Sequence, residues 1–87
     1  MVEEALSSLR AGDLVLVVWE KDMEDCHNIY SWGIFLGCGK TFLKLGNAYS
    51  PNFQDWEIRK IGIKAVKDIQ VIMVDAVGGI PVEGEKY

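Results

Sequence analysis

The sequence predicts a mostly β domain, in which a short N-terminal helix is followed by a five-stranded, strongly bent barrel. The chain has 87 residues, enough for one domain, and its 49% hydrophobic and 25% charged residues are typical of a globular protein. Apolar residues near the N-terminus follow a helical period, whereas short strand-like runs separated by glycine-containing turns make up most of the remainder. The stretch from Ser31 to Ala48 is the most informative, because two such runs meet there at a glycine-rich turn.

The N-terminal segment is predicted to be a short amphipathic helix that docks on the barrel. One helical face carries Val2, Ala5, Leu6 and Leu9. The Ala11–Gly12 pair ends the helix, and a helix this short needs a surface to pack on. The run Leu14–Trp19 that follows is apolar at every position, so we expect a strand covered on both faces, by the barrel interior on one side and by the helix outside.

The second strand is predicted at Ile29–Leu36, after a polar loop at Glu20–Asn28. Gly33 lies inside this strand and marks a sharp bend or a close approach of two backbones, as barrel closure requires. Gly37–Lys40 is predicted to be a hairpin turn, because its two glycines accept a positive φ at little cost.

The third strand is predicted at Thr41–Tyr49 and the fourth at Trp56–Val66. The loop Ser50–Asp55 between them contains a proline and holds Phe53. In the fourth strand the apolar residues change from one parity to the other, which predicts a bulge near Arg59–Lys60.

The fifth strand is predicted at Ile69–Val74, after a tight turn at Lys67–Asp68. One barrel domain with its helix then spans residues 1–75. Residues 76–87 form a C-terminal tail that contains two glycines in succession and a proline, and we expect this tail to fray.

Neither a metal site, a cofactor nor an enzymatic activity is expected from the sequence. Cys26 and Cys38 are isolated, and His27 is the one histidine, whereas a structural zinc site needs four ligands in spaced pairs. Adjacent residues of an extended segment point to opposite faces, so Cys26 and His27 do not form a nucleophile and base. The sequence Gly37–Thr41 ends in Gly-Lys-Thr, but a strand-like run follows it, so no helix N-terminus faces a phosphate.

The charges are distributed unevenly along the chain, whose formal net charge is −4. Residues 1–30 carry seven acidic and two basic side chains, whereas residues 31–67 carry six basic and two acidic ones. The middle of the chain can therefore present one basic rim on an acidic protein. The chain has no apolar run of the roughly 20 residues that span a membrane, and its first residues lack the order of a signal peptide, so we expect a cytoplasmic protein without a membrane partner.

The order of one helix and five strands, with a glycine in the second strand, resembles the Sm-like family of SH3-like barrels over residues 2–74. Phe42–Ala48 is similar to the end of the first Sm motif, and Ile63–Ile69 is similar to the second. The resemblance implies a non-catalytic ring that binds single-stranded RNA or serves as a scaffold. The residues at the equivalent rim positions are Lys40, Thr41 and Lys64.

Two departures from the family pattern concern RNA binding. The turn Gly37–Thr41 lacks the aspartate and asparagine that uridine-binding members carry there, and Lys64–Ala65 stands where the family has Arg-Gly. A lysine is a point charge without the planar fork and stacking surface of an arginine. A pocket specific for uracil is therefore not expected.

The sequence also predicts a homo-oligomer. The last strand is apolar apart from Gln70 and contains no proline, so as a sheet edge it needs a defined partner. The resemblance implies that the fourth strand of one subunit pairs with the fifth strand of the next. The residues expected at this interface are Ile61, Ile63, Ile69, Val71, Ile72 and Met73.

An SH3-like protein-interaction module that binds a basic or extended peptide is the alternative. The chain is rich in aromatic residues for its size, and the acidic loop Glu20–Asn28 could select basic peptides. Aromatic residues of a small barrel are usually part of its core, so only Phe53 is expected to be exposed. Whether Trp32 and Trp56 lie on one open face of the barrel or inside it distinguishes the peptide-binding module from the Sm-like ring.

Overall fold

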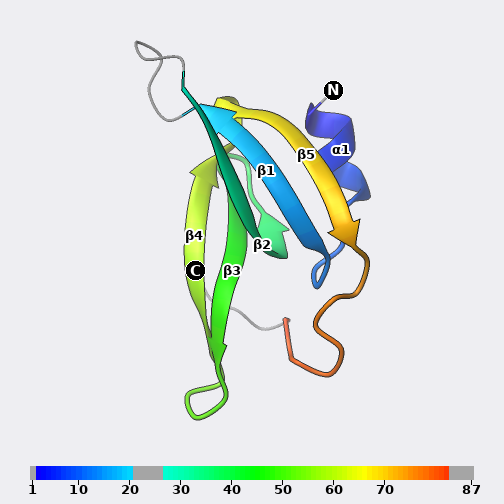
Figure 1. Ribbon diagram of the computed structural model, residues 1–87, viewed down its shortest axis with the longest axis vertical. Helices are drawn as coiled ribbons and strands as arrows, with labels where there is room; N and C mark the ends of the chain where they lie inside the picture. The colour runs from blue at the N-terminus through cyan, green and yellow to red at the C-terminus, as the bar shows by residue number, and fades with distance from the viewer. Residues whose placement is uncertain (1, 21–26, 83–87) are drawn as a thin grey trace.

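A computed structural model describes residues 2–20 and 27–82 of the chain. In this part of the chain the fold is a single antiparallel sheet with one short helix (Figure 1). Helix α1 (Val2–Ser8) precedes all five strands. The strands are β1 (Leu14–Glu20), β2 (Asn28–Cys38), β3 (Phe42–Ser50), β4 (Asp55–Gly62) and β5 (Val66–Met73). Their order in the sheet is β4-β3-β2-β1-β5, so β4 and β5 form its two edges. The predicted helix and five strands are confirmed.

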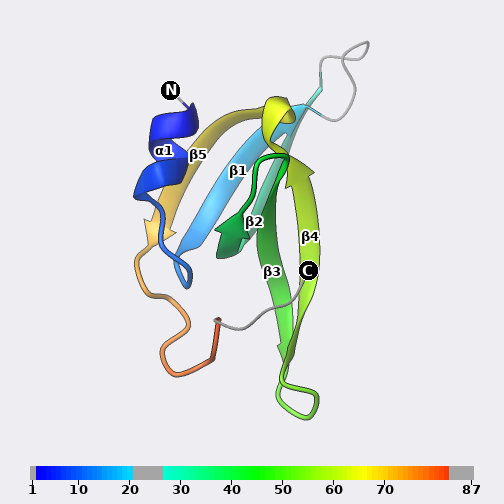
Figure 2. The ribbon, with the colours of Figure 1, turned by 180° about the vertical axis from the view of Figure 1, so that it is seen from behind.

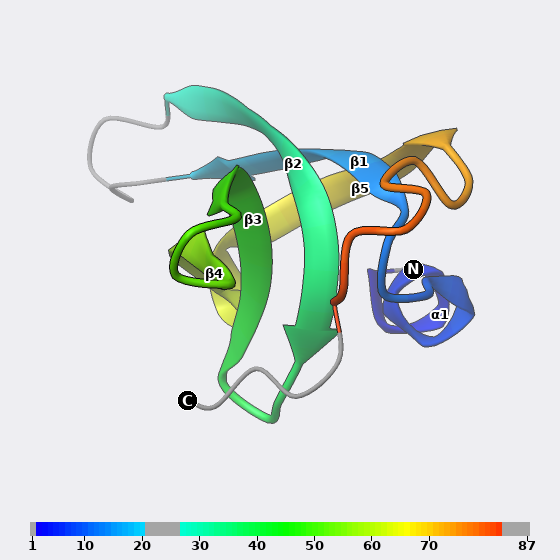
Figure 3. The ribbon, with the colours of Figure 1, turned by 90° about the horizontal axis from the view of Figure 1, so that it is seen from below.

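The long strand β2 bends and changes its partner halfway along its length. Residues 28–34 pair with β1, whereas residues 34–38 pair with β3, and Figure 3 shows the strand curving from one neighbour to the other. Gly33 lies at this change of partner. A Cβ atom there would be 2.9 Å from the Cβ of Leu45, closer than packed side chains allow, and 3.2 Å from the carbonyl oxygen of Gly46, which is a tight contact. The predicted close approach of two backbones at Gly33 is confirmed.

The core lies inside the curve of the sheet and is built from alternate residues of the strands. Its fully buried side chains are Val15, Val17, Leu43, Leu45 and Ile61. Ala5, Leu6 and Leu9 pack against this cluster, and α1 runs along β5 (Figure 2). The expectation that the helix covers the outer face of β1 is therefore wrong. The helix instead lies on the core side of the β1–β5 pair, as does the β3–β4 hairpin (Figure 3).

The connection between β4 and β5 differs from the prediction. Strand β4 ends at Gly62, a 3-10 turn spans Ile63–Ala65, and Lys67 and Asp68 belong to β5 instead of forming a tight turn. These two strands lie at opposite edges of the sheet, so the chain has to cross between them. Apolar residues continue through the crossing, and for this reason the sequence resembles one uninterrupted strand.

The bulge expected at Arg59–Lys60 occurs in the neighbouring strand instead. The β3–β4 register shifts between Gly46 and Ala48, so Asn47 is the additional residue. Gly46 accommodates the indole ring of Trp56: a Cβ atom there would be 2.5 Å from Trp56 Cε3. Strand β4 itself has no additional residue, so Trp56 and Ile61, which differ in parity, lie on opposite faces of it, and the predicted bulge in β4 is wrong.

A buried carboxylate joins the start of β1 to the chain that leaves β5. Asp13 is only 5% exposed, and its Oδ1 accepts a hydrogen bond of 3.0 Å from the backbone N–H of Asp75. Its Oδ2 accepts one of 3.2 Å from the N–H of Arg10. The N–H of Ala76 also donates to the carbonyl of Gly12, at 2.9 Å. Two segments that are 62 residues apart in the sequence are thus held together.

The chain after β5 is held at a second point, farther along. The indole N–H of Trp56 donates a hydrogen bond of 2.9 Å to the carbonyl oxygen of Pro81. The prediction that the tail frays from residue 76 is therefore wrong for residues 76–82. The glycines and the proline in this segment form turns that return the chain to β4.

The Gly46→Ala variant is expected to lose about 1–3 kcal/mol of unfolding free energy in urea titrations, because the added methyl group has to displace Trp56. Gly39→Ala is the matched control, since a Cβ atom at Gly39 meets nothing within 4 Å. It should change the free energy by less than about 0.5 kcal/mol. Equal stability of the two variants would contradict the tight contact between Gly46 and Trp56.

The Asp13→Ala variant is expected to be destabilised by about 1–3 kcal/mol, because two backbone N–H groups lose their buried acceptor. Hydrogen exchange should accelerate at the amide of Asp75. Asp68→Ala removes an exposed carboxylate from β5 and serves as the control, with an expected change below about 0.5 kcal/mol. An unchanged exchange rate at Asp75 in Asp13→Ala would contradict the proposed junction.

Candidate functional site

The residues predicted to contact RNA lie at one end of the sheet. The backbone N–H of Ile63 donates a hydrogen bond of 2.9 Å to the carbonyl oxygen of Thr41, which joins the β2–β3 turn to the 3-10 turn. Lys40 precedes Thr41 and Lys64 follows Ile63, and both lysines are exposed. We call Lys40, Thr41 and Lys64 the basic rim. Its two lysines are 24 positions apart in the sequence, and the hydrogen bond between the two turns brings these segments together.

A hollow of about 320 Å³ lies beside the basic rim, between it and α1. It is lined by Leu6, Ser7, Cys38, Gly39, Lys40 and Ile63. Cys38 is exposed, and its thiol donates a long hydrogen bond of 3.6 Å to the carbonyl oxygen of Gly39. A cysteine and a lysine are therefore among the residues that line this hollow.

The residues predicted for the oligomer interface fall into two groups. Ile61 and Ile69 belong to the core, and Ile63 is half-buried in the 3-10 turn. Val71, Ile72 and Met73 are exposed along β5, Ile72 to 50%. Exposed Val74 extends the same stretch. The structure thus gathers the exposed members on one sheet edge, β5.

Two exposed aromatic side chains on β2 were not foreseen. Trp32 is 55% exposed and Tyr30 is similar, because they share the outer face of the sheet with their β1 partners Leu16 and Val18. Phe53 is 81% exposed, as expected, whereas the expectation that no other aromatic residue is exposed is wrong. Alternation along β2 places Tyr30 and Trp32 on one face, but the positions of the β3–β4 hairpin and of the helix decide which face is covered.

An open groove of about 430 Å³ lies where β2 parts from β3. We call it the aromatic groove; its lining includes Tyr30, Trp32, Asn47, Glu57 and Arg59. The bulge residue Asn47 donates a hydrogen bond of 2.7 Å from Nδ2 to the carbonyl oxygen of Trp32. This bond connects the bulge of β3 to β2 beside the groove. Trp56, in contrast, is 8% exposed, so the two tryptophans do not share an open face.

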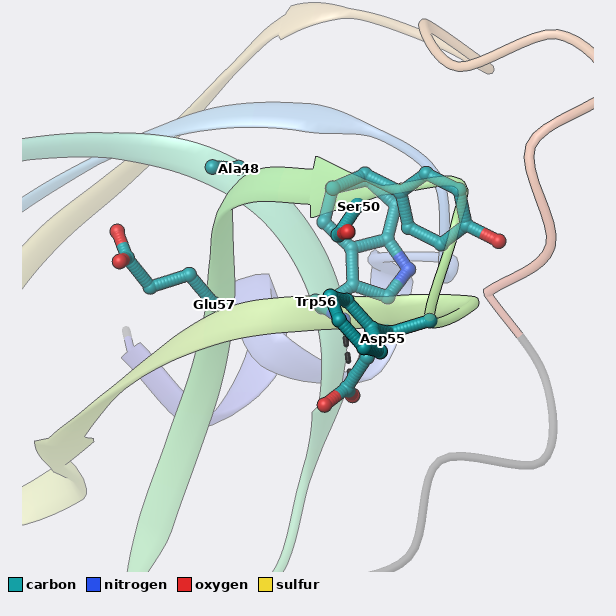
Figure 4. A pocket seen from close by; sticks show the side chains of 7 residues that line it. Ala48, Ser50, Asp55, Trp56 and Glu57 are labelled. Atoms are coloured by element: carbon teal, nitrogen blue, oxygen red, sulfur yellow. Dashed lines mark hydrogen bonds between the residues drawn. The ribbon is translucent and has the colours of Figure 1, made fainter.

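Trp56 forms the floor of a separate hollow of about 320 Å³ near the β3–β4 hairpin (Figure 4). Its ring centroid lies 5.1 Å from that of Tyr49, with the two planes tilted by 56°. The carboxylate of Asp55 accepts a 2.9 Å hydrogen bond from the backbone N–H of Trp56, and Figure 4 shows Glu57 pointing away from the rings. With its N–H bound to Pro81, the Trp56 indole has a structural role.

The predictions about a metal site and a catalytic cysteine concern residues that the structure describes only in part. Cys26 and most of the acidic loop lie outside the described residues, and His27 is exposed just before β2. Within residues 2–20 and 27–82, no group of three histidine, cysteine or acidic side chains is arranged to hold a metal ion. No helix in that part of the chain is long and apolar enough to cross a membrane.

No protein-family model, curated protein or solved structure matches this chain.

Proposed function

We propose that the protein is a non-catalytic, Sm-like barrel that assembles into a homo-oligomeric ring. The proposal rests on the exposed apolar stretch of β5. Strand β5 is one edge of the sheet, and β4 is the other. An exposed edge of this kind, rich in apolar side chains and without a proline, is a template for pairing with another chain. A defined partner strand would satisfy its backbone groups and cover Val71, Ile72 and Met73.

A second copy of the chain supplies such a strand through the free edge of its β4. Pairing β5 of one subunit with β4 of the next is head-to-tail, so the contact repeats until a ring closes. The core positions of Ile61 and Ile69 are compatible with this arrangement, because these two residues would contribute backbone hydrogen bonds and support the interface from within the subunit.

We further propose that the basic rim of each subunit binds single-stranded RNA through its phosphates. Lys40 and Lys64 are exposed beside Thr41, whose hydroxyl can donate to a phosphate oxygen. A ring repeats these groups around its axis, so several weak contacts add up along one strand. Because neither lysine can form the two parallel hydrogen bonds of an arginine, the contact distinguishes bases poorly.

Light scattering at micromolar concentration should give a mass several times that of the monomer. The Ile72→Lys variant is expected to shift the protein to the monomer, because a charge on the exposed edge opposes strand pairing. Phe53→Lys, at the more exposed tip of the β3–β4 hairpin, is the control and should leave the mass unchanged. A monomeric wild-type protein would overturn the ring.

The RNA contact is tested by fluorescence titration with oligouridine at low and at moderate salt. Lys40→Gln and Lys64→Gln are each expected to reduce the slope of log K against log salt concentration by about 0.7, the value for one phosphate contact on a single strand. Lys67→Gln is the control, since Lys67 pairs with Glu20 at 3.1 Å on β5. Absence of binding at low salt would remove RNA from the proposal and leave the ring standing.

A protein-interaction module remains the second candidate, and the exposure of Trp32 and Tyr30 favours it. Tyr30 and Trp32 lie on the half of β2 that pairs with β1 and not with β3, so an extended peptide could pair with the side of the strand that faces β3. Titration with an extended lysine-rich peptide should then shift the tryptophan fluorescence of the wild-type protein and not that of Trp32→Phe. If the peptide leaves the wild-type fluorescence unchanged, this candidate loses its support.

A further inference from the structure

Three aromatic side chains and two carboxylates meet at the hollow near the β3–β4 hairpin. This hollow of about 320 Å³ is lined by Tyr49, Phe53 and Trp56 together with Asp55 and Glu57. Among the residues that the structure describes, no lysine, arginine or histidine lines it. Its volume lies at the small end of the range for ligand pockets. The hollow therefore combines aromatic walls with charges of one sign, which is negative.

The rings of Tyr49 and Trp56 form a corner of the hollow. Their centroids are 5.1 Å apart, and their planes are tilted by 56°. The two residues are directly opposite each other in the β3–β4 register, so strand pairing holds their backbones side by side. A cation is attracted to an aromatic ring when it lies over the ring face, within about 6 Å of the centroid. Two ring faces that are this close and not parallel can therefore contact the same cation.

The indole of Trp56 is held in place from the side opposite the hollow. A Cβ atom at Gly46 would be 2.5 Å from Cε3 and 3.0 Å from both ring atoms bonded to it, Cδ2 and Cζ3, so Gly46 lies over one face of the ring. The indole N–H is bound to the carbonyl oxygen of Pro81. Trp56 is 8% exposed and lines the hollow, so its small accessible area is the floor of the hollow.

Phe53 stands at the edge of the hollow, on the turn of the hairpin. A hydrogen bond of 3.3 Å from the N–H of Gln54 to the carbonyl oxygen of Pro51 closes this turn. Gln54 has a φ of 51°, in the left-handed region that residues other than glycine seldom adopt. The turn leaves Phe53 81% exposed, although its side chain lines the hollow. A ligand in the hollow would cover part of a ring that otherwise faces water.

We propose that Tyr49, Phe53, Asp55 and Trp56, named here the hairpin pocket, bind a trimethylammonium group. Aromatic faces attract a cation but replace poorly the hydrogen bonds that an ordinary ammonium makes with water. A trimethylammonium group has no N–H to leave unpaired, and its methyl groups can pack against the rings. The inference goes beyond the ring and the RNA contact and depends on neither.

The carboxylates add the charge that favours a cation over a neutral apolar group. Asp55 accepts one hydrogen bond, from the backbone N–H of Trp56, and its carboxylate keeps its negative charge. Glu57 points away from the rings, so its charge acts from a greater distance (Figure 4). Both side chains are exposed, and salt therefore screens their contribution.

The test is an NMR titration of the full chain with two carriers of this group, choline and a short peptide that contains one trimethyl-lysine. At least one of them is expected to bind with a Kd on the order of 1 mM or lower and to shift the indole N–H signal of Trp56. Dimethylbutanol, the uncharged isostere of choline, and the same peptide with unmodified lysine are the matched ligands. Each should bind at least about fivefold more weakly than its counterpart.

Variants of the pocket are compared with an exposed phenylalanine elsewhere on β3. Phe53→Ala and Tyr49→Leu are each expected to weaken binding about two- to fivefold, whereas Tyr49→Phe keeps the ring and should bind as the wild type does. Asp55→Asn can still accept the hydrogen bond from Trp56, and it should weaken binding and lower its salt dependence. Phe42→Ala, at the start of β3, is the control and should leave the affinity unchanged. Urea titration establishes that each variant is folded.

The outcomes decide both the pocket and the carrier of the group. Binding of choline without the peptide assigns a free quaternary ammonium, and tighter binding of the peptide assigns a modified lysine. The pocket is overturned if neither ligand binds at about 10 mM, tenfold above the expected Kd. It is also overturned if the matched ligands bind equally well, or if Phe53→Ala binds as the wild type does. The mass by light scattering and the titration with oligouridine judge the ring and the RNA contact separately.

Discussion

The contact between the backbones of β2 and β3 at Gly33 is the constraint on which the other features depend. A side chain at this position would collide with Leu45 and with the carbonyl of Gly46, so only glycine lets β2 leave β1 and join β3. The bend allows one sheet to curve around its own core (Figure 3). It also separates the first half of β2 from β3, and the aromatic groove forms in that gap.

The remaining irregularities compensate for this curvature. Next to the point where β2 joins β3, β3 contains the additional residue Asn47. Its side chain donates a hydrogen bond to the carbonyl oxygen of Trp32 and so connects β3 to the first half of β2. Trp56 packs on Gly46 and reaches the carbonyl of Pro81, so the chain after β5 is fastened to β4. Buried Asp13 fastens the beginning of that same segment. The edges of the sheet are thus tied together by side chains and by the returning chain.

The surfaces of the protein differ in chemistry because charge and aromatic residues are segregated by strand. The lysines of β3, β4 and the adjoining turns lie near one end, around Phe42, although the whole chain is acidic. The exposed rings of β2 line the aromatic groove together with one acidic and one basic side chain of β4, Glu57 and Arg59. The exposed residues at the end of β5, Val71 to Met73, are apolar, whereas the exposed residues before them, Lys67, Asp68 and Gln70, are polar. The proposed partners, a nucleic acid, a peptide and a second copy of the chain, are each assigned to a different one of these surfaces.

Local sequence alone determined the elements: the helix, the five strands, the hairpin turns and the need for glycine at position 33. Periodicity and turn residues carry this information, because they act over a few neighbouring positions. Tertiary structure decided where the chain crosses at Ile63–Ala65, that the bulge is Asn47, and that the helix leaves Trp32 exposed. Alternation reveals that residues share a face, but which face is covered depends on elements far away in the sequence. For the same reason, Lys44 and Lys60 become neighbours only when β3 and β4 pair.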